Sequence, residues 1–482
     1  MPKCIIEGCD EVDMKREAII HINIEKRTIY YFISFICLII CCFFSDYKIA
    51  SYVSFAIYIA YIVVIILNSP RVIFKYLYFF FMMVANVLGC FICEFGDLYL
   101  IEIETNTHYV GALPVLVLAQ LVFFTCIYER ETKTGNKSLL FYSRSRINER
   151  TLFFLNCFVF ILYGLLFVHI LPYSALNMNV DRMTFASMEY NGGIWNYLSK
   201  WTQFFIVIPI GCIVYTKNKG YKAFGIITLF VYCLYYLWIG NKFGPFFSLF
   251  CVFCMLMFSR LDIKEKTIKR VFLIVIAAML AFVFAAAYIF TNYQSKGTDI
   301  IYYLQKRLAE QGQLFWKTYE ASAGKYHISE ISTEISGQLH SANNAEELLG
   351  AKYGIYNIMY LCAPKQRVDG VILYGSRYTE AGYASAYYYF GIIGCILFAM
   401  IVARLIVLVT NAVATSTKNN NLLGMFFMIR MFFIICTAWQ MFLFRDFITG
   451  TSIITYIWLC FFTGEKKIII KNGRLKILSF HI

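Results

Sequence analysis

The sequence predicts an all-α polytopic membrane protein, and three observations lead to this fold class. First, 60% of the 482 residues are hydrophobic and only 15% are charged, whereas soluble domains are about 45–50% apolar with about 25% charge. Second, apolar segments recur along nearly the whole chain, many near the length of a membrane span, about 20 residues. Third, Lys and Arg gather in alternate loops between these segments, a bias typical of membrane proteins.

Twelve segments are predicted to span the membrane, nine within residues 28–290 and three within residues 386–462. Their predicted bounds are 28–44, 49–67, 77–95, 109–128, 151–171, 195–215, 223–239, 243–258, 271–290, 386–409, 422–444 and 447–462. In lipid, a helix satisfies its own backbone hydrogen bonds. We therefore expect about 12 transmembrane helices.

The loops fall into two sets that differ in charge. The basic set comprises the tail at 1–27, the loops at 71–75, 130–150, 217–222 and 260–270, and the tail at 463–482. The alternate loops are short, neutral or acidic, at 46–48, 96–108 and 172–194. Because cytoplasmic loops attract Lys and Arg, both termini are predicted to be cytoplasmic. The net charge of +14 follows from this bias, so nucleic acid is not an expected partner.

One large polar loop, at 291–385, is then predicted to be external. It carries nine Lys and Arg, nine Asp and Glu and two His. Its apolar residues recur at helical spacing and predict amphipathic helices on the membrane face, around 301–319 and again at 345–361. A loop of this kind more often covers a lipid-facing site than serves only as a packing lid.

Arg377, Glu380 and Tyr383 lie within about two helical turns where this loop enters the next apolar segment. The planar guanidinium of Arg stays charged and binds phosphate through two parallel hydrogen bonds. Arg377 is therefore a candidate for a lipid pyrophosphate, with an interfacial ion pair to Glu380 as the alternative. Arg367, in the same loop, is a further candidate.

Other charged residues lie at the predicted external ends of spans, where charge is costly and usually faces a polar cavity. Arg182, Lys242 and Arg445 belong to this group. They either anchor lipid headgroups or converge on one anionic site. His340, in the external loop, is a candidate base, with a surface His as the alternative.

The sequence contains no recognisable motif for binding a metal or a cofactor. The sequence has no P-loop, no dinucleotide fingerprint, no Gly-x-Ser-x-Gly elbow and no His-Glu-x-x-His. Most of the 17 cysteines lie in apolar segments and only Cys362 lies in the long loop, so no disulfide framework is implied. Cys4 and Cys9 fit no zinc spacing. No metal and no cofactor are predicted.

The segment from Gly350 to Gly394 resembles the Wzy-type oligosaccharide repeat-unit polymerases, which make bacterial O-antigen and capsule. The resemblance rests on Ala363-Pro-Lys-Gln-Arg367, on Tyr378-Thr-Glu-Ala-Gly-Tyr383 and on the following Tyr389-Phe-Gly-Ile-Ile-Gly394. Asp181-Arg182 and Arg445-Asp446 also look like family features. One departure is that Lys365-Gln366 separates Pro364 from Arg367, where members often place Arg directly after Pro.

The resemblance implies a metal-independent, inverting glycosyltransferase of the GT-C-like fold, related to O-antigen ligases, in the bacterial inner membrane. Its substrates would be undecaprenyl-pyrophosphate-linked oligosaccharides, joined into lipopolysaccharide O-antigen or capsule at the outer face. The resemblance also implies a possible partner, a protein that regulates chain length. Glu380 or His340 would act as base. Arg182, Lys242, Arg367, Arg377 and Arg445 would bind pyrophosphate, and Tyr383 the sugar. A lipid-oligosaccharide flippase, another transporter and a ligase-type glycan transferase remain alternatives.

Overall fold

The computed structural model is almost entirely helical. It describes residues 30–133, 148–171, 193–239, 244–259, 270, 300–340, 345–418, 421–450, 452–453, 457, 467–471 and 474–478. Two small antiparallel hairpins interrupt the helices of this part of the chain. They pair β1 (Tyr99–Leu100) with β2 (Thr105–Asn106), and β3 (Lys467–Lys471) with β4 (Arg474–Leu478). The second hairpin lies in the region that the sequence predicted only as a tail.

Seven helices of the described chain are long and apolar enough to cross a membrane. They are α2 (Lys48–Asn68), α4 (Leu77–Phe95), α5 (Leu113–Lys133), α6 (Glu149–Ile170), α10 (Lys219–Trp238), α17 (Ala381–Lys418) and α18 (Leu422–Met441). Shorter apolar helices cover Tyr30–Phe43, Trp201–Tyr215 and Gly244–Phe258. The predicted span at 271–290, and most of that at 447–462, lie outside the described residues. The protein is thus a helical membrane protein, and the count of twelve spans stays a prediction.

The exposed face of α17 shows why these helices belong in lipid. Ile393, Leu397, Ile401 and Leu405 are all exposed and recur every four residues, which places them on one face of the helix. Water-soluble proteins rarely expose a contiguous apolar surface of this kind. The opposite face, with residues such as Ala399 and Val402, packs against α5 and α18.

Shorter helices connect the apolar helices and form the region of the large polar loop. They are α3 (Pro70–Lys75), α8 (Gly193–Phe205), α9 (Val207–Tyr215), α11 (Gly244–Phe258), α13 (Ile300–Ser322), α14 (Ile331–Leu339), α15 (Gly354–Cys362) and α16 (Lys365–Leu373), with single 3₁₀ turns at Ile328–Glu330, Glu346–Leu348 and Arg445–Phe447. The predicted span at 195–215 is therefore divided into α8 and α9. The predicted helix at 345–361 is a 3₁₀ turn followed by α15.

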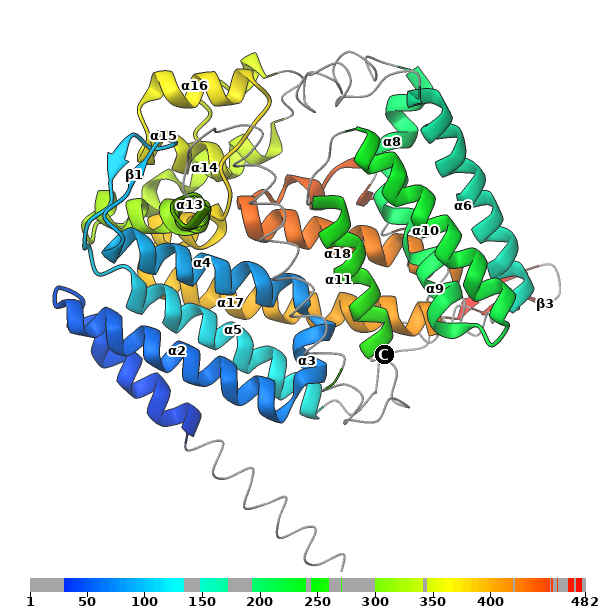
Figure 1. The fold of residues 1–482 in the computed structure, drawn as a ribbon, viewed down its shortest axis with the longest axis horizontal. Coiled ribbons are helices and arrows are strands. Elements are labelled where there is room, and N and C mark those ends of the chain that lie inside the picture. The colour runs from blue at the N-terminus through cyan, green and yellow to red at the C-terminus, as the bar shows by residue number, and fades with distance from the viewer. Residues whose placement is uncertain are drawn as a thin grey trace, which may run out of the picture.

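Two loops of the acidic or neutral set, at 46–48 and 96–108, lie at one end of the bundle, near α13 to α16 (Figure 1). Two hydrogen bonds join these loops to α13: Tyr319 Oη with Ser45 Oγ at 3.2 Å, and Trp316 Nε1 to the carbonyl of His108 at 3.0 Å. A third joins the segment after α18 to α14, where the amide of Phe444 donates to Gln338 Oε1 at 3.0 Å. The basic loop at 71–75 lies at the other end of α4. There Lys75 Nζ lies 2.8 Å from the carboxylate of Glu131, and Arg71 Nε donates to the carbonyl of Phe258 at 3.0 Å.

The predicted amphipathic helix is α13, and it is pressed against the membrane bundle. Its buried residues include Leu314, Phe315 and Trp316, and it packs on α4, α15 and α17. Gly312 of α13 meets Gly89 of α4 so closely that a Cβ on either residue would overlap the backbone of the other helix. This glycine contact fixes α13 over the end of α4 and positions the loop that follows.

Helix α17 begins before the predicted span and is broken inside it. The structure places its first residue at Ala381 rather than Ala386, and the backbone at Gly391 leaves the helical region with φ 62° and ψ −147°. Positive φ is easy only for glycine, and a Cβ there would also overlap the ring of Tyr326. The first ten residues of α17 therefore form a separate arm that ends the polar loop.

Candidate functional site

A cavity of about 470 Å³ opens in the region of the large polar loop, between the β1–β2 hairpin and α16. Its charged lining residues are Glu102, Arg367 and Arg377, and the remainder are Gln366, Gly370, Val371, Tyr374, Ser376 and Tyr378. Glu102 comes from the link between α4 and α5, more than 260 residues before the two arginines in the sequence. The fold thus brings into one cavity a carboxylate and two guanidinium groups that lie far from it in the sequence.

Glu102 is held in place from two sides. The side-chain amide of Gln313, on α13, donates to its carboxylate, and the hydroxyl of Tyr378 donates to its backbone carbonyl. Burial raises the pKa of Glu102 to about 7, and the nearby carboxylate of Glu310 adds to that rise. The carboxyl group therefore titrates near neutral pH, the range in which a general base is most effective.

Arg377 and Arg445 act on the same part of the structure. The guanidinium of Arg377 lies 5.6 Å from the ring centroid of Tyr356, and its Nη1 is 3.4 Å from Sδ of Met441. Burial raises the pKa of both Tyr353 and Tyr356, and both guanidinium groups oppose that rise. The structure therefore brings these two predicted residues to one region, where positive charge accumulates.

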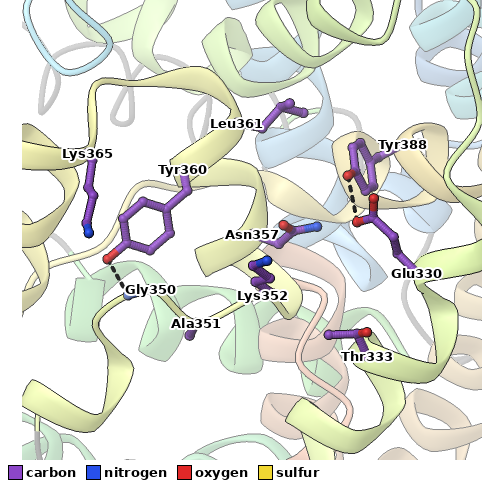
Figure 2. Close-up of a pocket in the computed structure, with 10 residues that line it drawn as sticks. All are labelled: Glu330, Thr333, Gly350, Ala351, Lys352, Asn357, Tyr360, Leu361, Lys365 and Tyr388. Carbon is purple, nitrogen blue, oxygen red and sulfur yellow. Dashed lines mark hydrogen bonds between the residues drawn. The ribbon is translucent and has the colours of Figure 1, made fainter.

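Arg367 and its neighbour Lys365 face two different cavities. Arg367 is in the first turn of α16 and lines the cavity of Glu102, as does Gln366. Lys365 lines a second cavity of about 670 Å³, formed with α14, α15 and the start of α17 (Figure 2). The N-terminal turn of α16 is thus a wall common to two pockets.

Glu380 is buried directly before α17 and lines neither of these two cavities. Its φ of 66° is unusual for a residue other than glycine. The side chain of Gln440 hydrogen-bonds to its carboxyl, whose pKa is raised by burial. Next to it, a Cβ on Gly382 would overlap the carbonyl of Trp439. Glu380 therefore lies where the start of α17 packs closely against the end of α18.

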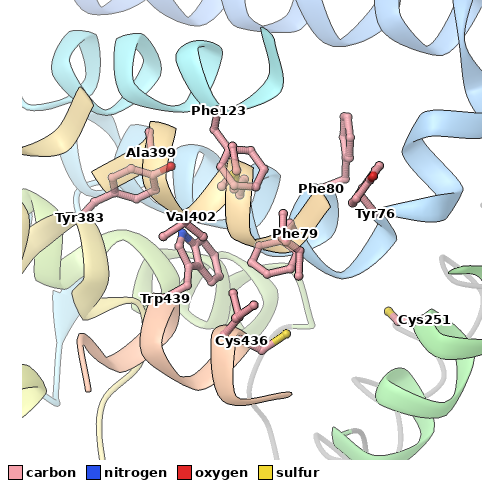
Figure 3. Packing of buried hydrophobic residues seen from close by; sticks show 14 of the residues in the cluster. Tyr76, Phe79, Phe80, Phe123, Cys251, Tyr383, Ala399, Val402, Cys436 and Trp439 are labelled. Atoms are coloured by element: carbon pink, nitrogen blue, oxygen red, sulfur yellow. The ribbon is translucent and has the colours of Figure 1, made fainter. Parts of the chain in front are cut away.

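Two further predicted residues, Tyr383 and His340, line neither cavity. Tyr383 is buried, with its ring at 5.7 Å from Phe398 and 6.4 Å from Trp439 in edge-on contacts (Figure 3). His340 is exposed at the end of α14. Arg182 and Lys242 lie outside the described residues. Among the residues that the structure describes, no three His, Cys, Asp or Glu side chains are grouped as a metal site.

The chain is similar to a family of unknown function, DUF6418, whose model matches residues 349–461. No curated protein and no solved structure matches. The matched stretch contains α15 to α18, and with them Arg367, Arg377, Glu380 and Arg445. Glu102 lies outside it.

Glu102 is the charged cavity residue that the sequence did not single out as a candidate. The sequence marks Glu102 only as an acid in a short loop between two spans. The one available signal is the run of polar residues on the buried side of α13, where Glu310 and Gln313 require partners. Nothing in the sequence indicates which loop supplies them.

Proposed function

We propose that this protein polymerises oligosaccharide repeat units into a surface polysaccharide, O-antigen or capsule, at the outer face of a bacterial inner membrane. The substrates are two undecaprenyl-pyrophosphate-linked oligosaccharides, one the donor and one the acceptor. The observation that supports the proposal is the cavity in which Arg367 and Arg377 meet Glu102 at the loop end of a membrane bundle. The resemblance described above supplies the identity of the substrates.

The arginines would bind the pyrophosphate of the donor. When the bond between the donor sugar and its pyrophosphate breaks, negative charge accumulates on the leaving oxygen. Guanidinium groups already directed at that position stabilise the charge without reorganisation. Arg377 and Arg367 line the cavity directly, and Arg445 adds positive charge beside Arg377. This role uses side-chain charge and needs no metal ion.

Glu102 would take the proton of the acceptor hydroxyl. That oxygen attacks the anomeric carbon, a new glycosidic bond forms, and the lipid pyrophosphate leaves with the bonding electrons. The proton passes to the Glu102 carboxylate and then to water. We assign this role to Glu102 in place of Glu380 and His340, because it is the carboxylate that lines the cavity of the two arginines.

Deletion of the gene followed by complementation tests the proposal. Surface glycan from each strain is separated on a gel. Polymerase activity predicts that the deletion strain retains a single repeat unit on its lipid anchor and that complementation restores the ladder. A deletion strain with no repeat unit at the surface would contradict it and would favour a flippase or a ligase.

A further inference from the structure

The second cavity, of about 670 Å³, is large enough for a small organic ligand and is not used by the proposed reaction. It is formed by α14, the segment before α15, α15 itself and Tyr388 of α17. Figure 2 shows Lys365 and Tyr360 at one side of this pocket, Glu330 and Tyr388 at the other, and Lys352 between them.

The charge of the cavity is unbalanced. Lys352 and Lys365 are both exposed, and in the part of the chain that the structure describes neither forms a salt bridge. The one carboxylate in the lining, Glu330, is already engaged. It accepts a hydrogen bond from Tyr388 at 2.9 Å, and His327 Nδ1 lies 3.2 Å from its other oxygen. Two ammonium groups therefore remain for a ligand.

The neutral polar groups of the lining are those that bind hydroxyl-rich ligands. Tyr360 is fixed because its hydroxyl accepts from the amide of Gly350 at 2.7 Å and donates to Asp369 at 2.6 Å. Asn357 donates from Nδ2 to Tyr389 at 3.2 Å, which orients its carbonyl oxygen. A mixture of amide, hydroxyl and ammonium groups on fixed backbone suits a sugar better than a lipid tail.

The two cavities adjoin through α16. Lys365 and Arg367 are two residues apart, which is about 3 Å along a helix axis, yet each lines a different pocket. A glycan in the second cavity would therefore lie beside the cavity of Glu102 and the arginines. This is the position required of an acceptor whose hydroxyl must reach the donor.

We propose that the second cavity binds an anionic sugar, one that carries a carboxylate, within the acceptor repeat unit, and that Lys352 and Lys365 recognise its charge. The identification of this sugar as part of the acceptor rests on the proposed function. The chemistry of the ligand follows from the lining of the cavity alone.

Binding to the purified full-length protein in lipid nanodiscs tests this inference. The probes are trigalacturonate, which is anionic, the neutral trigalactose, and inorganic phosphate, each followed by titration calorimetry. Trigalacturonate should bind at least about tenfold more tightly than trigalactose, since hydrogen bonds to charged groups are the stronger ones. The double variant Lys352→Ala/Lys365→Ala should lose that preference. The Lys325→Ala variant removes an exposed lysine of the same loop outside both cavities and should bind as the wild type does.

Three results would overturn the inference: equal affinity for the two sugars, a preference that survives in the double variant, or competition by phosphate at the same affinity as trigalacturonate. The test contains no transfer step, so it separates the two proposals. Charge-dependent sugar binding in a protein whose deletion leaves the polysaccharide ladder intact would retain the site and reject the polymerase. If deletion removes the ladder and the protein binds charged and neutral sugars equally well, the polymerase proposal is retained and the anionic-sugar site is rejected.

Discussion

Glu102 combines the properties that a proton acceptor needs in the proposed reaction. It lines the cavity of the two arginines, hydrogen bonds from Gln313 and Tyr378 hold it, and its pKa is raised to about 7. A carboxyl group of ordinary pKa is a weaker base at neutral pH, because base strength rises with pKa. The environment of Glu102 therefore matters as much as its position.

We predict that activity rises with pH through about 7, because the carboxyl of Glu102 holds its proton below that pH and cannot accept another. Glu310→Gln removes a negative charge that raises this pKa, so the rise should move to lower pH. Glu102→Gln should lower the rate by about 10²–10⁴-fold. The measurement is the rate of polymer formation by purified protein across a pH series. A normal rate in Glu102→Gln would exclude it as the base, whereas Glu104→Gln, in the same loop, serves as the control and should remain active.

In the proposed reaction, Arg377 binds the pyrophosphate leaving group. Arg377→Ala should abolish the polysaccharide ladder with the protein at its normal level in the membrane. Arg377→Lys should restore only part of it, because an ammonium group cannot form the two parallel hydrogen bonds of a guanidinium. The control is Arg404→Ala, an exposed arginine in the membrane part of α17. A ladder of normal length from Arg377→Ala would remove this residue from the site.

At the scale of the elements, the length of the apolar segments predicted the positions of the helices well, but it did not predict where the helices are interrupted. The bounds of α4 are those predicted, and α2, α6 and α10 differ by a few residues. The break at Gly391 and the division between α8 and α9 were missed. The break at Gly391 depends on the backbone angles of a single residue, to which an average over apolar residues is insensitive.

The break in α17 gives a prediction of its own. Gly391→Ala should strongly destabilise the protein, because alanine is strained at a φ of 62° and its methyl group would overlap Tyr326. Gly164→Ala, in the middle of α6 with open space around it, should be neutral or stabilising by about 0.5–1 kcal/mol. Thermal unfolding in detergent measures both. Equal melting temperatures for the two variants would show that the break at Gly391 is not required.

At the scale of the whole molecule, the loops at 46–48 and 96–108 lie at one end of the described bundle and the basic loop at 71–75 lies at the other. The alternation of Lys-rich and Lys-poor loops in the sequence predicts such an arrangement, and the side of the membrane that each end faces stays a prediction. The sequence could not predict that the 96–108 loop would meet the 300–380 region, since that contact depends on the close glycine packing of α13 on α4. The sequence therefore predicted only part of the candidate site. Arg367 and Arg377 were expected, and Glu102 was not.

Reporter fusions test the sidedness of the molecule. Alkaline phosphatase fused after residue 104 or after residue 346 should be active, since both positions belong to the end predicted to be external. Fusions after residue 75 or residue 133 should be inactive with phosphatase and fluorescent with green fluorescent protein. Opposite results at residues 104 and 346 would contradict the shared cavity, because the structure places both loops at one end.

The most direct test of the central claim uses purified protein in vesicles that contain undecaprenyl-pyrophosphate-linked repeat units. We predict that each new glycosidic bond releases one undecaprenyl pyrophosphate, so that polymer and free lipid pyrophosphate appear in equal amounts, and that Arg377→Ala produces neither. Lipid-linked units that cross the vesicle membrane without any release of lipid pyrophosphate would contradict the account and identify a transporter.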